Sequence, residues 1–198
     1  MGPRLFPATQ ARNIIERMVR TGAISGPKAE AWSKKFADEE KVKETRAKAE
    51  SGDTKAMCKV GTWCEEGSMG LAKDLQQATG WYRRGHNLGD PTCTTCLGFR
   101  YEDADNPEIY PYAAHLYTAA TAGGSMLGCY YLATSFTGGG VGLQQNHRKA
   151  TRWYRAMQSA SVHDLSDDED DMNEQAVDWL RKNAVSDDDD LDDDDDSS

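Results

Sequence analysis

The chain has 198 residues, with 33 acidic and 23 basic side chains and a formal net charge of −10 at neutral pH. Seventeen of the acidic residues lie from His163 onward, against only Arg181 and Lys182, so the preceding residues are mildly basic and the C-terminal segment is a polyanion. This asymmetry indicates an appended acidic tail and argues against an acidic fold. We also expect no membrane-spanning helix, because no run of about 18 apolar residues occurs.

The cellular location follows from similar reasoning. Five cysteines without an apolar secretory leader favour reduced thiols in the cytoplasm or the nucleus. The alternative is an organellar protein, because residues 1–22 carry four arginines against Glu16, a composition seen in transit peptides.

Two helices are predicted before any repeat begins. Residues 8–21 carry apolar side chains at helical spacing, namely Ala11, Ile14, Ile15, Met18 and Val19. Pro27 suits the first turn of a second helix, which we expect to span 27–50. We therefore assign residues 1–26 to an N-terminal arm with an amphipathic helix.

Three blocks of similar sequence follow from residue 49. The equivalent first positions are Val60-Gly61, Leu97-Gly98 and Leu132-Ala133, and the equivalent second positions are Ala78, Ala113 and Ala150. Because the first set recurs after 37 and then 35 residues and the second after 35 and then 37, the middle block needs a connection two residues shorter. The pattern predicts an all-α solenoid of helix–turn–helix repeats over residues 27–162, with about three repeats and a preceding helix.

Each second helix carries an aromatic pair and a capping signal. Trp81-Tyr82, Leu116-Tyr117 and Trp153-Tyr154 are equivalent, and we expect the tryptophans to be the main anchors. Asp74 is predicted to cap the first of these helices with Gln77 completing a capping box, and Asn146 to cap the third.

The order Ala-x-x-x-Leu-Gly-x-x-x-Tyr, Gly-x-Gly-Val, Asp-x-x-x-Ala-x-x-Trp-Tyr and a closing Gly resembles the Sel1-like repeat. The match covers about residues 49–162 and is best from Ala56 to Asp90, whereas the middle block lacks Gly-x-Gly-Val and has Leu116 in place of tryptophan. The resemblance implies an α-solenoid that binds other proteins on its concave face as a scaffold or adaptor and is not an enzyme.

On that concave face, formed mainly by first helices, the candidate binding residues are Lys55, Lys59, Thr62, Thr94 and Thr95. The expected partner is another protein, and the sequence leaves the oligomeric state open. In the alternative, the polyacidic tail binds basic proteins in the manner of a chaperone. We expect no nucleic acid as a partner, because the tail would compete with phosphate for basic surfaces. We expect no membrane as a partner either, because no apolar stretch is long enough to span one.

Cys93-Thr-Thr-Cys96 is the only motif with possible redox or zinc chemistry. The repeat register places Cys93 where Ala56 and Gly128 lie, which favours a small buried packing residue. A thiol redox enzyme using Cys93 and Cys96 stays as a further alternative. Otherwise we expect no catalytic residue, cofactor or metal.

The acidic tail, residues 163–198, contains a predicted amphipathic helix over 171–185 and is disordered by composition from Asp187. The helix either caps the end of the solenoid or binds a partner. Acidic residues three positions downstream make Ser161, Ser166 and Ser186 candidate phosphorylation sites. Arginines on the second helices form a solvated face, a weak anion-binding surface or a docking place for the tail: Arg83, Arg84, Arg148, Arg152 and Arg155.

Overall fold

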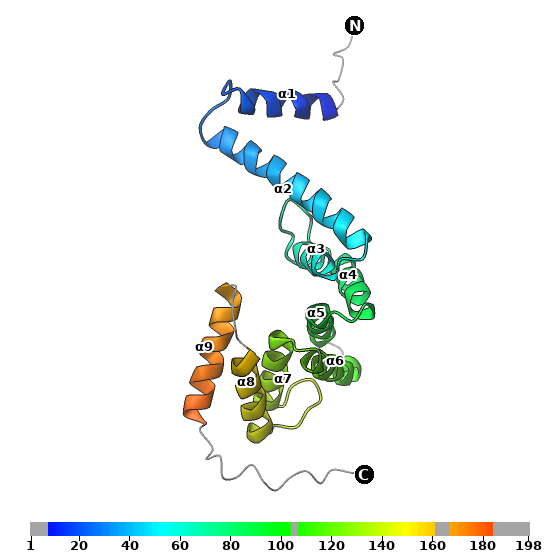
Figure 1. Ribbon diagram of the computed structural model, residues 1–198, viewed down its shortest axis with the longest axis vertical. Helices are drawn as coiled ribbons and strands as arrows, with labels where there is room; N and C mark the ends of the chain where they lie inside the picture. The colour runs from blue at the N-terminus through cyan, green and yellow to red at the C-terminus, as the bar shows by residue number, and fades with distance from the viewer. Residues whose placement is uncertain (1–7, 104–106, 161–166, 184–198) are drawn as a thin grey trace. The chain divides into compact units, whose positions relative to one another are not determined.

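The computed structural model describes residues 8–103, 107–160 and 167–183, in which the regular elements are nine α-helices and one 3₁₀ helix (Figure 1). This confirms the predicted all-α class. The chain forms two compact units, Met1–Trp81 and Tyr82–Ser198. The candidate phosphorylation sites Ser161, Ser166 and Ser186 and the predicted disorder from Asp187 lie outside the described residues.

Unit 1 contains α1 (Ala8–Arg20), α2 (Pro27–Glu50), α3 (Thr54–Glu66) and the first half of α4 (Leu75–Asn87). The first two helices match the predicted spans. They are held together by Arg12, whose Nη1 lies 2.6 Å from Glu39 Oε2 and whose guanidinium lies 5.4 Å from the centre of the buried Phe36 ring. The other side of α2 packs on α3, so the long second helix links the N-terminal arm to the first repeat.

Unit 2 is built from hairpins in two layers. Helix α5 (Pro91–Glu102) pairs with α6 (Tyr110–Ala122), and α7 (Met126–Gly138) pairs with α8 (His147–Ala160). The 3₁₀ helix Pro107–Ile109 precedes α6, and α9 (Asp167–Lys182) packs on both α7 and α8. Because α5 contacts α7 and α7 contacts α9, these three helices form an inner layer, with α6 and α8 outside it.

The repeat register is confirmed by burial. Ala78, Ala113 and Ala150 of the second helices are completely buried. On the first helices, the mutually equivalent residues Val60, Leu97 and Leu132 are at most 2% exposed. The predicted role of the tryptophans needs correction. Tyr82, Tyr117 and Tyr154 are buried, whereas Trp81 and Trp153 are half-buried. The tyrosine follows Ala by four residues, and at this helical spacing it lies directly on the buried face.

Caps set the start of each helix. Asp74 Oδ1 accepts the Gln77 N–H at 2.9 Å and Asn146 Oδ1 accepts the Lys149 N–H at 2.9 Å, as predicted. The capping box is not completed, because Gln77 Oε1 instead accepts bonds from Arg46 Nη2 at 3.0 Å and Cys64 Sγ at 3.1 Å. The Asp74 backbone N–H donates to the Cys64 carbonyl oxygen at 2.7 Å.

The first helices have caps that the sequence reasoning missed. Asp53, Asp90 and Ser125 occupy equivalent positions, and their side chains accept the N–H three residues later at 2.8–3.1 Å. Each follows a glycine with positive φ, namely Gly52, Gly89 and Gly124. The glycine lets the preceding segment turn and the next residue caps the following helix, so one dipeptide makes each junction between repeats.

The loops that connect the two helices of the first and of the third repeat have the same backbone conformation. Gly67 and Gly139 cap α3 and α7 in the left-handed conformation, with φ of 72° and 71°. Two residues later Met69 and Val141 also have positive φ, of 54° and 48°, which is costly for a side chain and indicates that the loop is held by its surroundings. The middle repeat lacks this loop in sequence and has the 3₁₀ helix instead.

Candidate functional site

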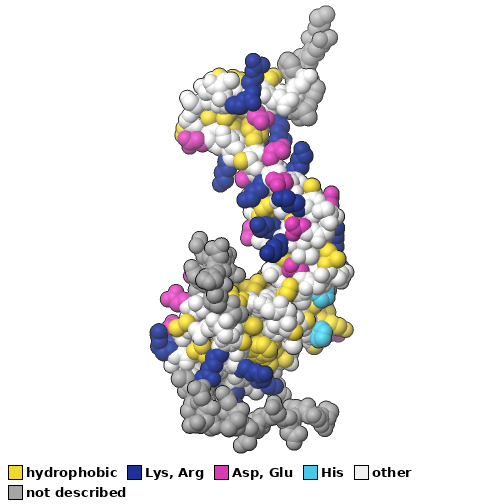
Figure 2. All heavy atoms as spheres, in the orientation of Figure 1, with side chains coloured by type: hydrophobic (Ala, Val, Ile, Leu, Met, Phe, Trp, Pro, Cys, Tyr) yellow, Lys and Arg dark blue, Asp and Glu magenta, His cyan; other side chains and the backbone are white. Residues whose placement is uncertain are grey.

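Three aromatic side chains line the inner layer of unit 2. Phe99 of α5 lies 5.4 Å from the Tyr131 ring of α7, and Tyr131 lies 5.5 Å from the neighbouring Tyr130 ring. Phe99 is 36% exposed and the two tyrosines are half-buried. We call Phe99, Tyr130 and Tyr131 the aromatic strip. Figure 2 shows hydrophobic side chains gathered over this part of unit 2, which makes the strip the strongest candidate for a binding surface.

The strip rests on a fixed base. The Tyr131 ring stacks on Tyr117, with centroids 5.3 Å apart and planes 12° apart. Tyr117 is completely buried, and its hydroxyl donates to Glu102 Oε2 at 2.6 Å. Burial, reinforced by the Glu102 carboxylate, raises the pKa of Tyr117 far above its usual range, so this phenol stays a donor at any physiological pH.

Tyr130, at one end of the strip, is hydrogen-bonded to the last helix, α9. Tyr130 Oη donates to Gln175 Oε1 of α9 at 2.7 Å, and the Tyr130 ring meets Tyr154 of α8 edge-on at 6.4 Å. Tyr130 and Tyr131 are therefore positioned by contacts to α6, α8 and α9. A surface whose rotamers are already fixed loses little conformational entropy when a ligand packs on it.

Three of the five predicted candidate residues occupy the same register positions as the strip. Counting from the buried leucine position of each first helix, Phe99 is equivalent to Thr62, Tyr131 to Lys59, and Tyr130 to Thr95. The sequence reasoning named polar residues at these positions and did not name the aromatic ones. The available signal was the presence of aromatic residues at positions for which the repeat pattern requires none.

The structure separates the five predicted residues into two groups. Lys55 and Lys59 are exposed on α3 of unit 1, and the half-buried Thr62 hydroxyl donates to the Cys58 carbonyl at 3.1 Å. Thr94 and Thr95 are buried on α5 of unit 2. Their hydroxyls donate to the carbonyls of the preceding helical turn, at 2.7 and 3.0 Å, so these two side chains serve packing and are out of reach of a partner.

Helix α9 covers the C-terminal end of the repeats, within unit 2. Ala176 is completely buried against α7 and α8, and the Trp179 ring lies 5.2 Å from Tyr154 and 5.9 Å from His147. The structure therefore places α9 as a capping helix, one of the two interpretations open from sequence. It begins at Asp167, four residues before the predicted start, and ends at Lys182.

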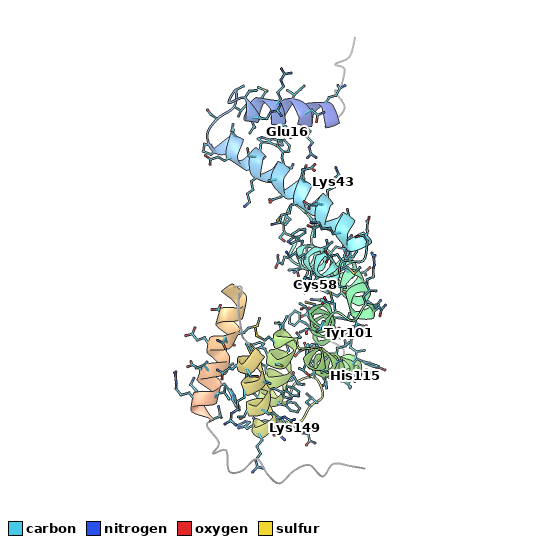
Figure 3. The ribbon with its side chains drawn as sticks, viewed as in Figure 1. Glu16, Lys43, Cys58, Tyr101, His115 and Lys149 are labelled. Carbon is cyan, nitrogen blue, oxygen red and sulfur yellow. The ribbon has the colours of Figure 1, made fainter. Side chains whose placement is uncertain are left out.

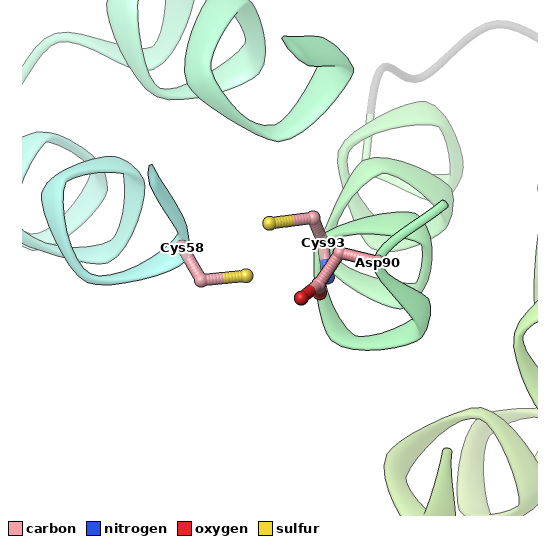
Figure 4. A group of neighbouring side chains, drawn as sticks. All are labelled: Cys58, Asp90 and Cys93. Carbon is pink, nitrogen blue, oxygen red and sulfur yellow. The ribbon is translucent and has the colours of Figure 1, made fainter. Parts of the chain in front are cut away.

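The cysteines lie at buried or half-buried positions of the first helices. Cys93 is buried, and its backbone N–H donates to Asp90 Oδ1 at 2.8 Å (Figure 4). Cys96 is half-buried one turn along α5. Cys58, also drawn in Figure 4, is half-buried on α3 of unit 1. Burial raises the pKa of the Cys64 and Cys129 thiols, which keeps them protonated and weakly nucleophilic at neutral pH.

Alkaline unfolding is expected to report the buried phenols. Burial raises the pKa of Tyr154 to about 12 from an ordinary value of 10.0. The unfolded chain therefore releases this proton first, and the stability that the folded state holds below pH 10 is lost as the pH rises toward 12. Urea midpoints should fall between pH 9 and pH 11, and Tyr154→Phe should make the decline shallower. An equal decline in both proteins would contradict the assignment.

Comparison with known proteins was informative only at the level of structure. No protein-family model and no curated protein matches this chain. A protective antigen of uropathogenic Escherichia coli that displays an SLR fold, the Sel1-like repeat fold, superposes on 89% of this chain with a TM-score of 0.52 and 18% identity. The chain has the Sel1-like repeat fold. It spans 46% of the length of that antigen.

A Sel1 repeat protein from Oxalobacter formigenes is also similar, with 19% identity, a TM-score of 0.49 and coverage of 68% of this chain and 98% of that protein. At these identities the likeness concerns the Sel1-like repeat fold alone. Among the described residues, no helix is both long enough and apolar enough to cross a membrane.

Proposed function

We propose that this protein is a scaffold or adaptor that binds a partner protein along the inner layer of unit 2. The observation that carries the proposal is the aromatic strip, because aromatic side chains contribute most of the binding energy at many protein interfaces. The strip is apolar at Phe99 and amphipathic at Tyr130 and Tyr131, a combination that suits an apolar anchor with a polar rim.

A peptide or helix with large apolar anchors is the partner chemistry that fits this surface. The exposed Lys55 and Lys59 of α3 and the neighbouring Thr62 stay part of the proposal as a second, basic contact region in unit 1. We propose no enzymatic activity, and we keep the cytoplasm or the nucleus as the expected location.

Loss of binding by strip variants tests this function. Phe99→Ser combined with Tyr131→Ser should weaken binding of a partner isolated with the wild-type protein by at least about tenfold, because two anchors are removed from the interface. The matched control is Tyr112→Ser on the outer helix α6, where the tyrosine is 63% exposed. Equal affinity of the strip variant and the control, measured by isothermal calorimetry, would exclude the strip as the binding surface.

The second candidate function is chaperone-like binding of basic proteins by the tail, which nine aspartates between residues 187 and 196 support. Such binding would be electrostatic and would weaken steeply with added salt. Binding through the strip would change little over the same range. A titration with a basic protein at 50 and 300 mM salt therefore distinguishes the two candidates.

A further inference from the structure

One face of α8 carries three exposed arginines. Arg148, Arg152 and Arg155 are spaced by four and three residues, which places them on one side of the helix, away from the buried Ala150 and Tyr154. We call these three residues the arginine stripe. Lys149 lies beside it at the start of α8 (Figure 3), and the helix contains no acidic residue. The exposed face of α8 therefore carries basic side chains and no acidic side chain of its own helix.

The repeat architecture does not require these arginines. In the same register, the first repeat has Gln76, Gly80 and Arg83, and the middle repeat has Pro111, His115 and Thr118. Two other repeats thus fold with mostly uncharged residues at the stripe positions. The concentration of arginines on α8 is therefore a feature of the third repeat and not of the repeat pattern.

The path of α9 brings the C-terminal segment to this helix. Along α9 the contacts proceed from Ala176, which clusters with Met157, to Trp179, which touches Tyr154 and His147. Rising numbers on α9 therefore meet falling numbers on α8, so the two helices are antiparallel (Figure 1). The chain leaves α9 after Lys182 at the end of α8 where Arg148 lies.

We propose that the aspartate-rich segment 187–196 of this chain docks on the arginine stripe of α8. Nine of its ten residues are aspartate, which complements three arginines on a helix without acids. The four residue-to-residue steps from position 183 to position 187 can span about 13 Å, and the segment itself can span about 33 Å. The stripe extends only about 10 Å along the helix axis, so the segment reaches all of it.

This contact makes the outer face of α8 a polyanion-binding site that is filled in cis. Because the segment is tethered, its effective concentration at the stripe is in the millimolar range. An acidic ligand from solution must compete with it, and added salt weakens the contact. The contact is independent of the aromatic strip, which lies on the inner layer of the same unit.

Competition with a fluorescein-labelled peptide of ten aspartates tests the proposal by fluorescence anisotropy. The full-length chain with all nine aspartates of 187–196 changed to asparagine should bind this peptide at least about tenfold more tightly than the wild type does, because the tethered competitor is removed. In that neutralised background, Arg148→Gln, Arg152→Gln and Arg155→Gln together should abolish the gain.

The matched control separates a local site from general electrostatics. Lys34, Lys41 and Lys43 are exposed on α2, and changing all three to glutamine in the neutralised background removes the same charge. This control should keep the gain, with circular dichroism confirming that each variant is folded. The proposal is overturned if the wild type and the neutralised chain bind the peptide equally, or if the α2 control loses as much affinity as the α8 variant.

Discussion

Changing Tyr117 to alanine is expected to lower the free energy of unfolding of unit 2 by about 3–5 kcal/mol. The ring is completely buried between α5, α6 and α7, stacks on Tyr131 and donates its hydroxyl hydrogen bond to Glu102. Its removal leaves a cavity at the centre of the middle repeat and frees the base of the aromatic strip. The effect is read from chemical denaturation followed by circular dichroism.

The control for this prediction lies on the same helix. Tyr112 of α6 is 63% exposed, so Tyr112→Ala should change the unfolding free energy by no more than about 0.5 kcal/mol. If both substitutions cost the same, Tyr117 is not the anchor of the middle repeat. A further substitution, Tyr117→Phe, isolates the hydroxyl group and should cost about 1–2 kcal/mol through its hydrogen bond to the Glu102 carboxylate.

The second large effect is expected at Gly98. A Cβ at this position in α5 would lie 2.8 Å from Tyr117 Cε1 and 3.0 Å from Cδ1. The ring cannot move away, because it is fully buried and bonded through its hydroxyl, so Gly98→Ala should destabilise the chain by about 1–3 kcal/mol despite the better helix propensity of alanine.

Gly80 provides the matched comparison. It is also a helical glycine, on α4, but a Cβ there meets no atom within 4 Å. Gly80→Ala should therefore stabilise the chain by about 0.5–1 kcal/mol, because only the backbone entropy of the unfolded chain changes. Thermal midpoints that move in opposite directions for the two variants would establish the close approach at Gly98. A rise at both positions would refute it.

The arrangement of the repeats follows from local sequence signals. Small residues recur with aromatic partners at helical spacing, Asp74 and Asn146 cap their helices, and glycines mark the turns. These signals act within a few residues of one another, so the chain alone predicts the helices, their order and the buried positions Ala78, Ala113 and Ala150. The resemblance to the Sel1-like repeat rests on the same pattern and is confirmed at the level of fold by the structural comparison.

Contacts between helices decide which small residues tolerate a larger side chain and which first-helix side chains stay exposed, and the repeat pattern predicts neither. The pattern treats Gly98 and Ala133 as interchangeable small residues, whereas the Tyr117 ring excludes a methyl group only at Gly98. The sequence pattern also does not distinguish threonines from aromatic residues on the first helices as candidates for binding a partner. Tertiary packing buries Thr94 and Thr95 and leaves Phe99 exposed, because that choice depends on what neighbouring helices place over each side chain.

By itself, the sequence determined an all-α repeat protein with an acidic C-terminal segment, because helix periodicity, capping and charge are properties of neighbouring residues. Only the tertiary structure decided that the tyrosines are the deeper anchors and that α9 caps the repeats. The same packing placed the aromatic strip on the inner layer of unit 2. These features join residues on different helices, and their distances are fixed by packing across the whole unit.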